Sequence, residues 1–138
     1  MEEDIKVSII KVAKDLNLKN MIFTDHLENP YPAINALDVF TLLSTAHEGV
    51  SQAFLQAPFL QKPIIATKTG GLKEVCIDNK TGIQVPVFSS RDVANAILQL
   101  QKDKKLRERY AQRAKELSVK FSENIMIDEM GKVYNKLI

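Results

Sequence analysis

The chain has 138 residues, which is enough for one domain with a buried core and too few for two typical domains. Hydrophobic residues make up 45% and charged residues 26%, while 19 basic and 17 acidic residues leave a net charge of +2. This composition is typical of a soluble globular protein, excludes a disordered chain and supplies no basic surface for nucleic acid.

Cysteine content and terminal sequence bear on the compartment. The single cysteine, Cys76, excludes an intrachain disulfide and indicates a reducing environment. The N-terminal residues are acidic where a signal peptide would be basic, and no apolar run approaches the ~20 residues of a membrane span. We therefore expect a cytoplasmic protein without a transmembrane segment, and attachment to the inner face of a membrane stays open.

Apolar spacing and turn residues predict helices alternating with strands along the chain. The expected helices span residues 5–16, 32–37, 51–60 and 72–77, and the expected strands span 21–24, 39–43, 63–67 and 83–85. Three further helices complete the chain, capped by Ser89 or Ser90, by Asp103 and by Ser122, and the apolar stripe of the last one is assigned to the core.

This alternation predicts an α/β fold with a Rossmann-like parallel sheet of about four strands and helices on both faces. The strand at 39–43 is apolar on both sides, as a covered parallel strand should be. We expect the strand at 21–24 to lie beside it, and residues 1–138 to form one domain.

Two glycine-containing loops follow predicted strands and should meet at one edge of the sheet. The first, at 44–51, contains Glu48, Gly49 and a hydroxyl at a helix start, Ser51. The second, at 67–71, contains Gly70 and Gly71. Unpaired amides at a helix N-terminus suit a phosphate, so the loops indicate a phosphorylated ligand. Ordinary strand-end turns are the alternative.

The stretch from Asp38 to Val85 resembles the C-terminal domain of the GT-B fold retaining glycosyltransferases of glycosyltransferase family 4, also called glycosyl transferases group 1. The family pattern is a strand and a serine, E-G-F-G, a second glutamate eight residues after the first, G-K-P, A-T, G-G-x-x-E and T-G. The flanks, including Phe23 and residues 121–134, agree as well, so the resemblance covers nearly the whole chain. The matching residues are Asp38-Val39-Phe40, Ser44, Glu48-Gly49-Val50-Ser51, Gln56, Lys62-Pro63, Ala66-Thr67, Gly70-Gly71, Glu74 and Thr81-Gly82.

The resemblance implies a nucleoside-diphosphate sugar as donor, transfer with retention of configuration, and no metal or other cofactor. Glu48 inherits the place beside the donor sugar and is the catalytic candidate, while Gln56 inherits the position that binds the ribose. Eight residues of helix rise ~12 Å, comparable to the reach from sugar to ribose. The implied donor-binding residues are His47, Gly49, Val50, Ser51, Gln52, Gln56, Thr67, Gly70 and Gly71.

Several positions depart from the family pattern. Gln56 replaces the glutamate whose carboxylate binds the ribose in the family. Val50-Ser51 replaces F-G, and the Ser51 side chain is expected to cap the helix instead. Pro58 and Gln61 stand where a helix former and a helix-ending glycine are usual, so the helix should end near Ala57.

Compared with the family, the chain lacks an acceptor-binding domain and the first part of the donor domain. That part carries two strands and the Arg and Lys that neutralise the diphosphate. We therefore expect the isolated chain to be nearly inactive. The expected partners are the sugar nucleotide and either a separate N-terminal acceptor domain or a second copy associating through open sheet edges, not nucleic acid. A non-catalytic remnant or nucleotide-binding module of the same fold is the alternative function, whereas a sugar-nucleotide epimerase fits Glu48-Gly49 poorly.

Overall fold

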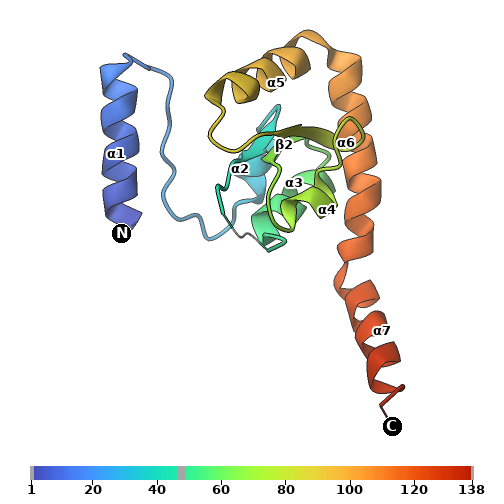
Figure 1. Ribbon diagram of the computed structural model, residues 1–138. Helices are drawn as coiled ribbons and strands as arrows, with labels where there is room; N and C mark the ends of the chain where they lie inside the picture. Colours follow the sequence, from blue (N-terminus) through green and yellow to red (C-terminus); the bar gives the residue numbers. More distant parts are fainter. Residues whose placement is uncertain (1, 47–48, 138) are drawn as a thin grey trace.

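A computed structural model describes residues 2–46 and 49–137 of the chain. Helices and short strands alternate through its middle, and the last third is helical (Figure 1). The elements in order are α1 (Glu2–Asp15), α2 (Tyr31–Asn35), β1 (Phe40–Leu42), α3 (Gln52–Phe59), β2 (Ile64–Thr67), α4 (Leu72–Val75), β3 (Gly82–Val85), α5 (Ser90–Lys102), α6 (Lys104–Ser118), the 3-10 helix η1 (Val119–Phe121) and α7 (Glu123–Tyr134).

The sheet of the described residues has three parallel strands in the order β1-β2-β3. Phe40 pairs with Ile64, and Ile64 pairs with Gly82 on its other side. The predicted fold class is confirmed, but the expectation of about four strands is wrong. Residues 21–24 form no strand, and Ile22 is 88% exposed. A strand requires a neighbour to take its backbone hydrogen bonds, and no strand of the described sheet pairs with this apolar segment.

Helices cover both faces of the sheet, as predicted, because consecutive residues of β2 point to opposite sides. Ile64 and Ala66 pack on one face with buried residues of α2, α3 and α4, among them Phe54. Ile65 packs on the other face with residues of α5 and α6, among them Leu100. All four residues of β2 are buried, which identifies it as the central strand of this sheet.

The first and last helices lie away from this core. Figure 1 shows the segment after α1 running between that helix and the rest of the molecule, and α7 projecting beyond the end of α6. The apolar stripe of α7 is exposed rather than part of the core, so that prediction is wrong; its exposed members include Met126, Met130 and Val133. The sequence period was helical, but no described element packs over this stripe.

Side-chain caps begin two of the C-terminal helices, as the sequence predicts. The Ser89 hydroxyl accepts a hydrogen bond from the Asp92 backbone N–H at α5, and the Asp103 carboxylate accepts one from Leu106 at α6. Ser122 occupies the corresponding position before α7 without making a side-chain cap. Each satisfied cap stabilises its helix by about 1 kcal/mol.

Helix α3 passes through Pro58 and ends one residue later, at Phe59, so the expected end near Ala57 is wrong. The Gln61 backbone N–H donates to the Pro58 carbonyl at 2.8 Å, and the Lys62 N–H donates to the Ala57 carbonyl at 2.9 Å. These two bonds form a Schellman motif, in which the residue at Gln61 takes a left-handed conformation. Its φ is +56°, the region that glycine adopts most readily.

The left-handed residue after α3 makes Gln61→Gly a stabilising substitution. We expect the free energy of unfolding to rise by about 1 kcal/mol, because glycine avoids the steric cost of positive φ. The gain is limited by loss of the exposed hydrogen bond from the Gln61 amide to Gln112. Thermal unfolding of the wild-type chain, Gln61→Gly and Gln112→Ala separates the gain from the relaxed backbone from the loss of the hydrogen bond. A melting temperature for Gln61→Gly below that of Gln112→Ala would contradict the expectation.

Candidate functional site

The two glycine-containing loops meet at the carboxyl ends of β1 and β2. A Cβ atom placed on Gly71 would lie 2.9 Å from the Gly49 carbonyl carbon and 3.0 Å from the Val50 nitrogen. The loops are joined a second time where the buried Thr67 hydroxyl donates to the Ser44 carbonyl at 2.6 Å. The predicted meeting of the loops is therefore confirmed by direct contact. Only glycine fits at position 71 without moving the backbone opposite it.

The first loop leads into the N-terminus of α3. Ser51 is the N-cap residue, with φ −65° and ψ 136°, and its carbonyl accepts from the Leu55 N–H at 3.1 Å. Its side chain makes no capping hydrogen bond, so the expected cap by the hydroxyl is wrong. The first backbone N–H groups of a helix have no partner within the helix and carry its positive dipole end. This helix start can therefore bind an anion.

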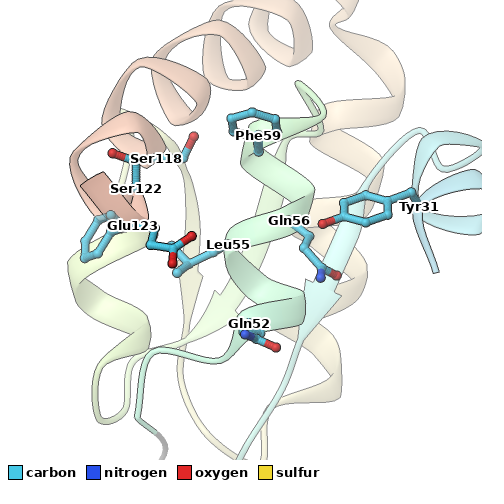
Figure 2. A pocket seen from close by; sticks show the side chains of 9 residues that line it. Tyr31, Gln52, Leu55, Gln56, Phe59, Ser118, Ser122 and Glu123 are labelled. Atoms are coloured by element: carbon cyan, nitrogen blue, oxygen red, sulfur yellow. The ribbon is translucent and has the colours of Figure 1, made fainter. Parts of the chain in front are cut away.

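Gln52 and Gln56 lie one turn apart on α3 and face a cavity of about 450 Å³. Figure 2 shows the Gln56 amide and Tyr31 on one side of α3, with Ser122 and Glu123 on the other. Apolar side chains of the helix, Leu55 and Phe59, also line the cavity. The cavity thus combines an apolar wall with several polar groups, which is typical of a ligand site.

A second cavity of about 310 Å³ lies at the carboxyl ends of the strands, lined by Thr45, Thr67 and Phe88 among others. Phe88 is 87% exposed and has φ +59°, which is uncommon for a bulky residue. Sequence reasoning missed Phe88 here and Tyr31 at the first cavity. The sequence signal for Phe88 is an aromatic residue just after a strand, and the signal for Tyr31 is an aromatic residue next to Pro30.

The predicted site residues are therefore brought together only in part. Gly49, Val50 and Gly71 meet, and Ser51 and Gln52 continue from them into α3. Gln52 and Gln56 line the larger cavity, whereas Thr67 lines the smaller one. Gly70 is exposed, with φ +47°. His47 and the catalytic candidate Glu48 lie outside the described residues.

Cys76 is fully buried behind this site, and its thiol donates to the Ile83 carbonyl at 3.5 Å. Burial raises the pKa of the thiol from 9.0 to about 12. The neutral thiol is a small hydrophobic group of the core and not a nucleophile.

The raised pKa of Cys76 predicts a loss of stability at high pH. The thiol ionises above about pH 9 in the unfolded chain but stays neutral in the folded one, so its contribution is complete below that pH. It should fall by about 1.4 kcal/mol per pH unit as the pH rises towards 12. Burial also raises the pKa of Tyr110, so this residue adds to the same loss of stability at high pH. Urea unfolding of the wild type and of Cys76→Ala isolates the contribution of the thiol, because both proteins contain Tyr110. Equal slopes of the free energy of unfolding against pH in the two proteins would contradict the prediction.

Among the described residues, no helix is both long and apolar enough to cross a membrane.

Comparison with known proteins identifies the family. Residues 3–117 match the family described as glycosyl transferases group 1. The uncharacterized glycosyltransferase MJ1178 of Methanocaldococcus jannaschii is 32% identical over 98 residues, which cover 71% of this chain and 28% of that protein.

Solved structures agree on the fold. The C-terminal domain of a glycosyl transferase group 1 family protein, LpcC of Francisella tularensis, has 27% identity and a TM-score of 0.74 over 87% of this chain and 64% of that one. Anabaena Alr3699/HepE, solved in complex with UDP-glucose, has 21% identity and a TM-score of 0.87 over 99% of this chain and 38% of that one. The match to MJ1178 spans less than a third of the length of that curated relative. It belongs to the glycosyl transferases group 1 family.

Proposed function

We propose that this chain is the donor-binding part of a retaining glycosyltransferase and holds a nucleoside-diphosphate sugar at the start of α3. The contact of Gly71 with the Gly49–Val50 backbone carries the proposal. That contact closes two loops around one helix N-terminus, where unpaired amides and a positive dipole end favour a diphosphate. Membership of the glycosyltransferase family supports the same ligand class.

Each part of the donor has a proposed partner. The backbone amides from Gly49 to Gln52 bind the diphosphate, and Gln56 binds the ribose, one turn further along α3. Glu48 is the proposed catalytic residue, because the family pattern assigns that role to the first glutamate. The remaining proposed donor-binding residues are His47, Thr67, Gly70 and Gly71. No metal or other cofactor is part of this proposal.

The isolated chain should bind the donor far better than it transfers the sugar. Stabilising charge on the leaving diphosphate is usually a large catalytic contribution. Lys68 in the second loop and Lys73 just after it are exposed to solvent, where their charges are screened. We therefore propose that turnover requires cations from another polypeptide segment.

Gln56→Glu should strengthen nucleotide binding. An ionised carboxylate accepts hydrogen bonds from both ribose hydroxyls, and such charge-assisted bonds are stronger than those of an amide. We expect the Kd to fall about tenfold, which corresponds to about 1.4 kcal/mol. The matched control is Gln99→Glu, which adds the same charge at an exposed position of α5. Equal gains in both variants would assign the effect to net charge.

The experiment that tests the proposed function is a calorimetric titration of the chain with UDP, GDP and ADP. Binding of one nucleotide with a Kd on the order of 1 mM or below supports it. No heat of binding from any of the three at millimolar concentration would contradict it. That result would favour the alternative, a non-catalytic remnant of the same fold. The observation that supports this alternative is Gln56, an amide at the position where the family has the carboxylate that binds the ribose.

A further inference from the structure

The turn between β3 and α5 exposes an aromatic ring. Phe88 is 87% exposed, although burial of an aromatic side chain contributes more to stability than burial of most others. Its φ of +59° places a bulky residue in the left-handed region, at a cost of roughly 1–2 kcal/mol. Phe88 thus combines two unfavourable features, and no packing of its ring in the core offsets them.

The other described non-glycine residues with positive φ have a local reason for it. They are Asn17, Asp25, Gln61 and Asn79. Asparagine and aspartate tolerate this region, because their short polar side chains bind the nearby backbone. Gln61 closes the Schellman motif at the end of α3. Neither reason holds for Phe88, and backbone strain at a bulky residue is typical of functional sites.

Phe88 forms one wall of the 310 Å³ cavity at the carboxyl ends of the strands. Three further apolar residues line it: Leu43 just after β1, Pro86 just after β3, and Val93 on α5. Val93 packs with the core on the α5 side of the sheet, whereas α3 packs on the other side. The cavity is therefore separate from the larger one, which α3 lines.

The polar groups of this cavity are hydroxyls. They belong to Thr45, Thr67, Ser89 and Ser90, and none of the described lining residues is ionisable. The Thr67 hydroxyl already donates to the Ser44 carbonyl, and the Ser89 hydroxyl caps α5. Thr45 and Ser90 are exposed, and their hydroxyls make no hydrogen bond with the described part of the chain. A cavity with these walls suits a neutral ligand that has hydroxyl groups of its own.

A sugar ring has the chemistry that these walls would recognise. One face of a pyranose presents C–H groups, and its edge carries hydroxyls. The C–H groups are weakly positive and the face of an aromatic ring is negative, so a sugar stacks on an exposed phenylalanine. Its hydroxyls can then bond to Thr45 and Ser90. Phosphate, carboxylate and ammonium ligands find no opposite charge among these described residues.

We propose that this cavity binds the sugar ring of a neutral acceptor, which stacks on Phe88 and bonds to the hydroxyls of Thr45 and Ser90. The place suits an acceptor, because Thr45 and Thr67 belong to the two loops that meet at the start of α3. The role of the bound sugar as acceptor rests on the proposed function. The binding of a neutral sugar does not, since it involves neither the amides at the start of α3 nor Gln56.

The test is an amide NMR titration of the isotope-labelled chain, without nucleotide, with the methyl glycosides of glucose, galactose, mannose and N-acetylglucosamine. With at least one of them, signals of Thr45 and of Phe88–Ser90 should shift together and give one Kd on the order of 10 mM. No shift with any of the four up to about 200 mM, or shifts confined to other surfaces, would overturn the proposal.

Calorimetry with nucleotides distinguishes failure of this proposal from failure of the proposed function. Sugar binding at Phe88 without binding of any nucleotide would support the sugar site and contradict the donor site. Nucleotide binding without sugar binding would overturn the sugar site and leave the donor site standing.

Three variants measure the contribution of the ring. Phe88→Asn removes the stacking surface and suits the left-handed backbone, so the affinity should fall at least fivefold while the melting temperature stays or rises. Phe88→Tyr should keep the affinity within about twofold, because the aromatic face remains. Tyr134→Ala removes an exposed ring from α7 and should leave the affinity unchanged. An affinity of Phe88→Asn equal to that of the wild type would overturn the proposal. A melting temperature several degrees lower would also overturn it, since the ring would then serve the fold.

Discussion

Gly82→Ala is expected to destabilise the chain by about 3 kcal/mol or more, the upper end of what overpacking costs. A Cβ at Gly82 would clash with the Ile64 carbonyl oxygen and would lie 2.7 Å from Ile64 Cγ1 and 3.0 Å from the Cys76 sulfur. Ile64 cannot move away easily, because it pairs with β1 on one side and with β3 on the other. Relief of the clash therefore requires opening the sheet.

Thermal and urea unfolding measure this effect. A loss of 3 kcal/mol corresponds to a fall in melting temperature of roughly 10 °C for a chain of this size. The control is Gly131→Ala, because a Cβ there meets nothing within 4 Å. Gly131 lies in the interior of α7, where alanine has a higher helix propensity than glycine. The substitution should stabilise by about 0.5–1 kcal/mol. A Gly82→Ala melting temperature within a degree or two of the wild type would contradict the packing described here.

Gly71→Ala should lower nucleotide affinity at least tenfold while leaving the fold intact. The backbone of Gly71, with φ −70° and ψ −11°, suits alanine, so the added methyl group acts only through its contacts. It would meet the Gly49 carbonyl carbon, the Val50 nitrogen and, at 3.1 Å, Val50 Cγ2. The loop would have to shift by several tenths of an ångström. Under the proposed function, that shift moves the amides that bind the diphosphate.

Calorimetry with the nucleotide that binds best measures the loss of affinity, and the melting temperature reports on the fold. Gly131→Ala again serves as the control, since it lies on α7 and should leave affinity unchanged. An affinity equal to that of the wild type, with the melting temperature also unchanged, would mean that the loop contact has no part in binding.

The stretch from β1 to β3 could be predicted from sequence because its signals are local. Apolar runs such as Ile64–Ala66 fall within a buried strand, and glycines at 70–71 and 82 mark the turn and the close approach of strands. The caps at Ser89 and Asp103 are equally local, since a short polar side chain binds an N–H three residues away. The meeting of the two loops followed from the parallel sheet alone.

The remaining errors concern features that depend on distant neighbours. Residues 21–24 have the composition of a strand, but strand formation requires hydrogen-bonding partners outside the segment. The stripe containing Met126 and Met130 has helical spacing, but spacing does not specify what packs over it. Pro58 was expected to end α3, yet its buried ring and the hydrogen bonds at Gln61 and Lys62 keep the last turn helical.

The candidate site was predictable to a similar extent. The positions of the glycines and Gln52 at the loops and at the start of α3 could be predicted because helix starts and tight turns have sequence signatures, whereas their roles in binding stay predictions. Tyr31 and Phe88 were missed because they reach the cavities through turns whose direction only the folded chain determines. Residue spacing also could not predict that Gln56 and Thr67 line two different cavities.

The most direct test of the donor-binding role is an amide NMR titration of the isotope-labelled chain with UDP, GDP and ADP. For the nucleotide that binds, amide signals of Gly49–Gln52 and Thr67–Gly71 should shift together and give one Kd, with Gln56 following them. Signals of α7, such as Gly131, should stay in place. Shifts confined to other surfaces, or none with any nucleotide up to about 10 mM, would contradict a donor site at the start of α3.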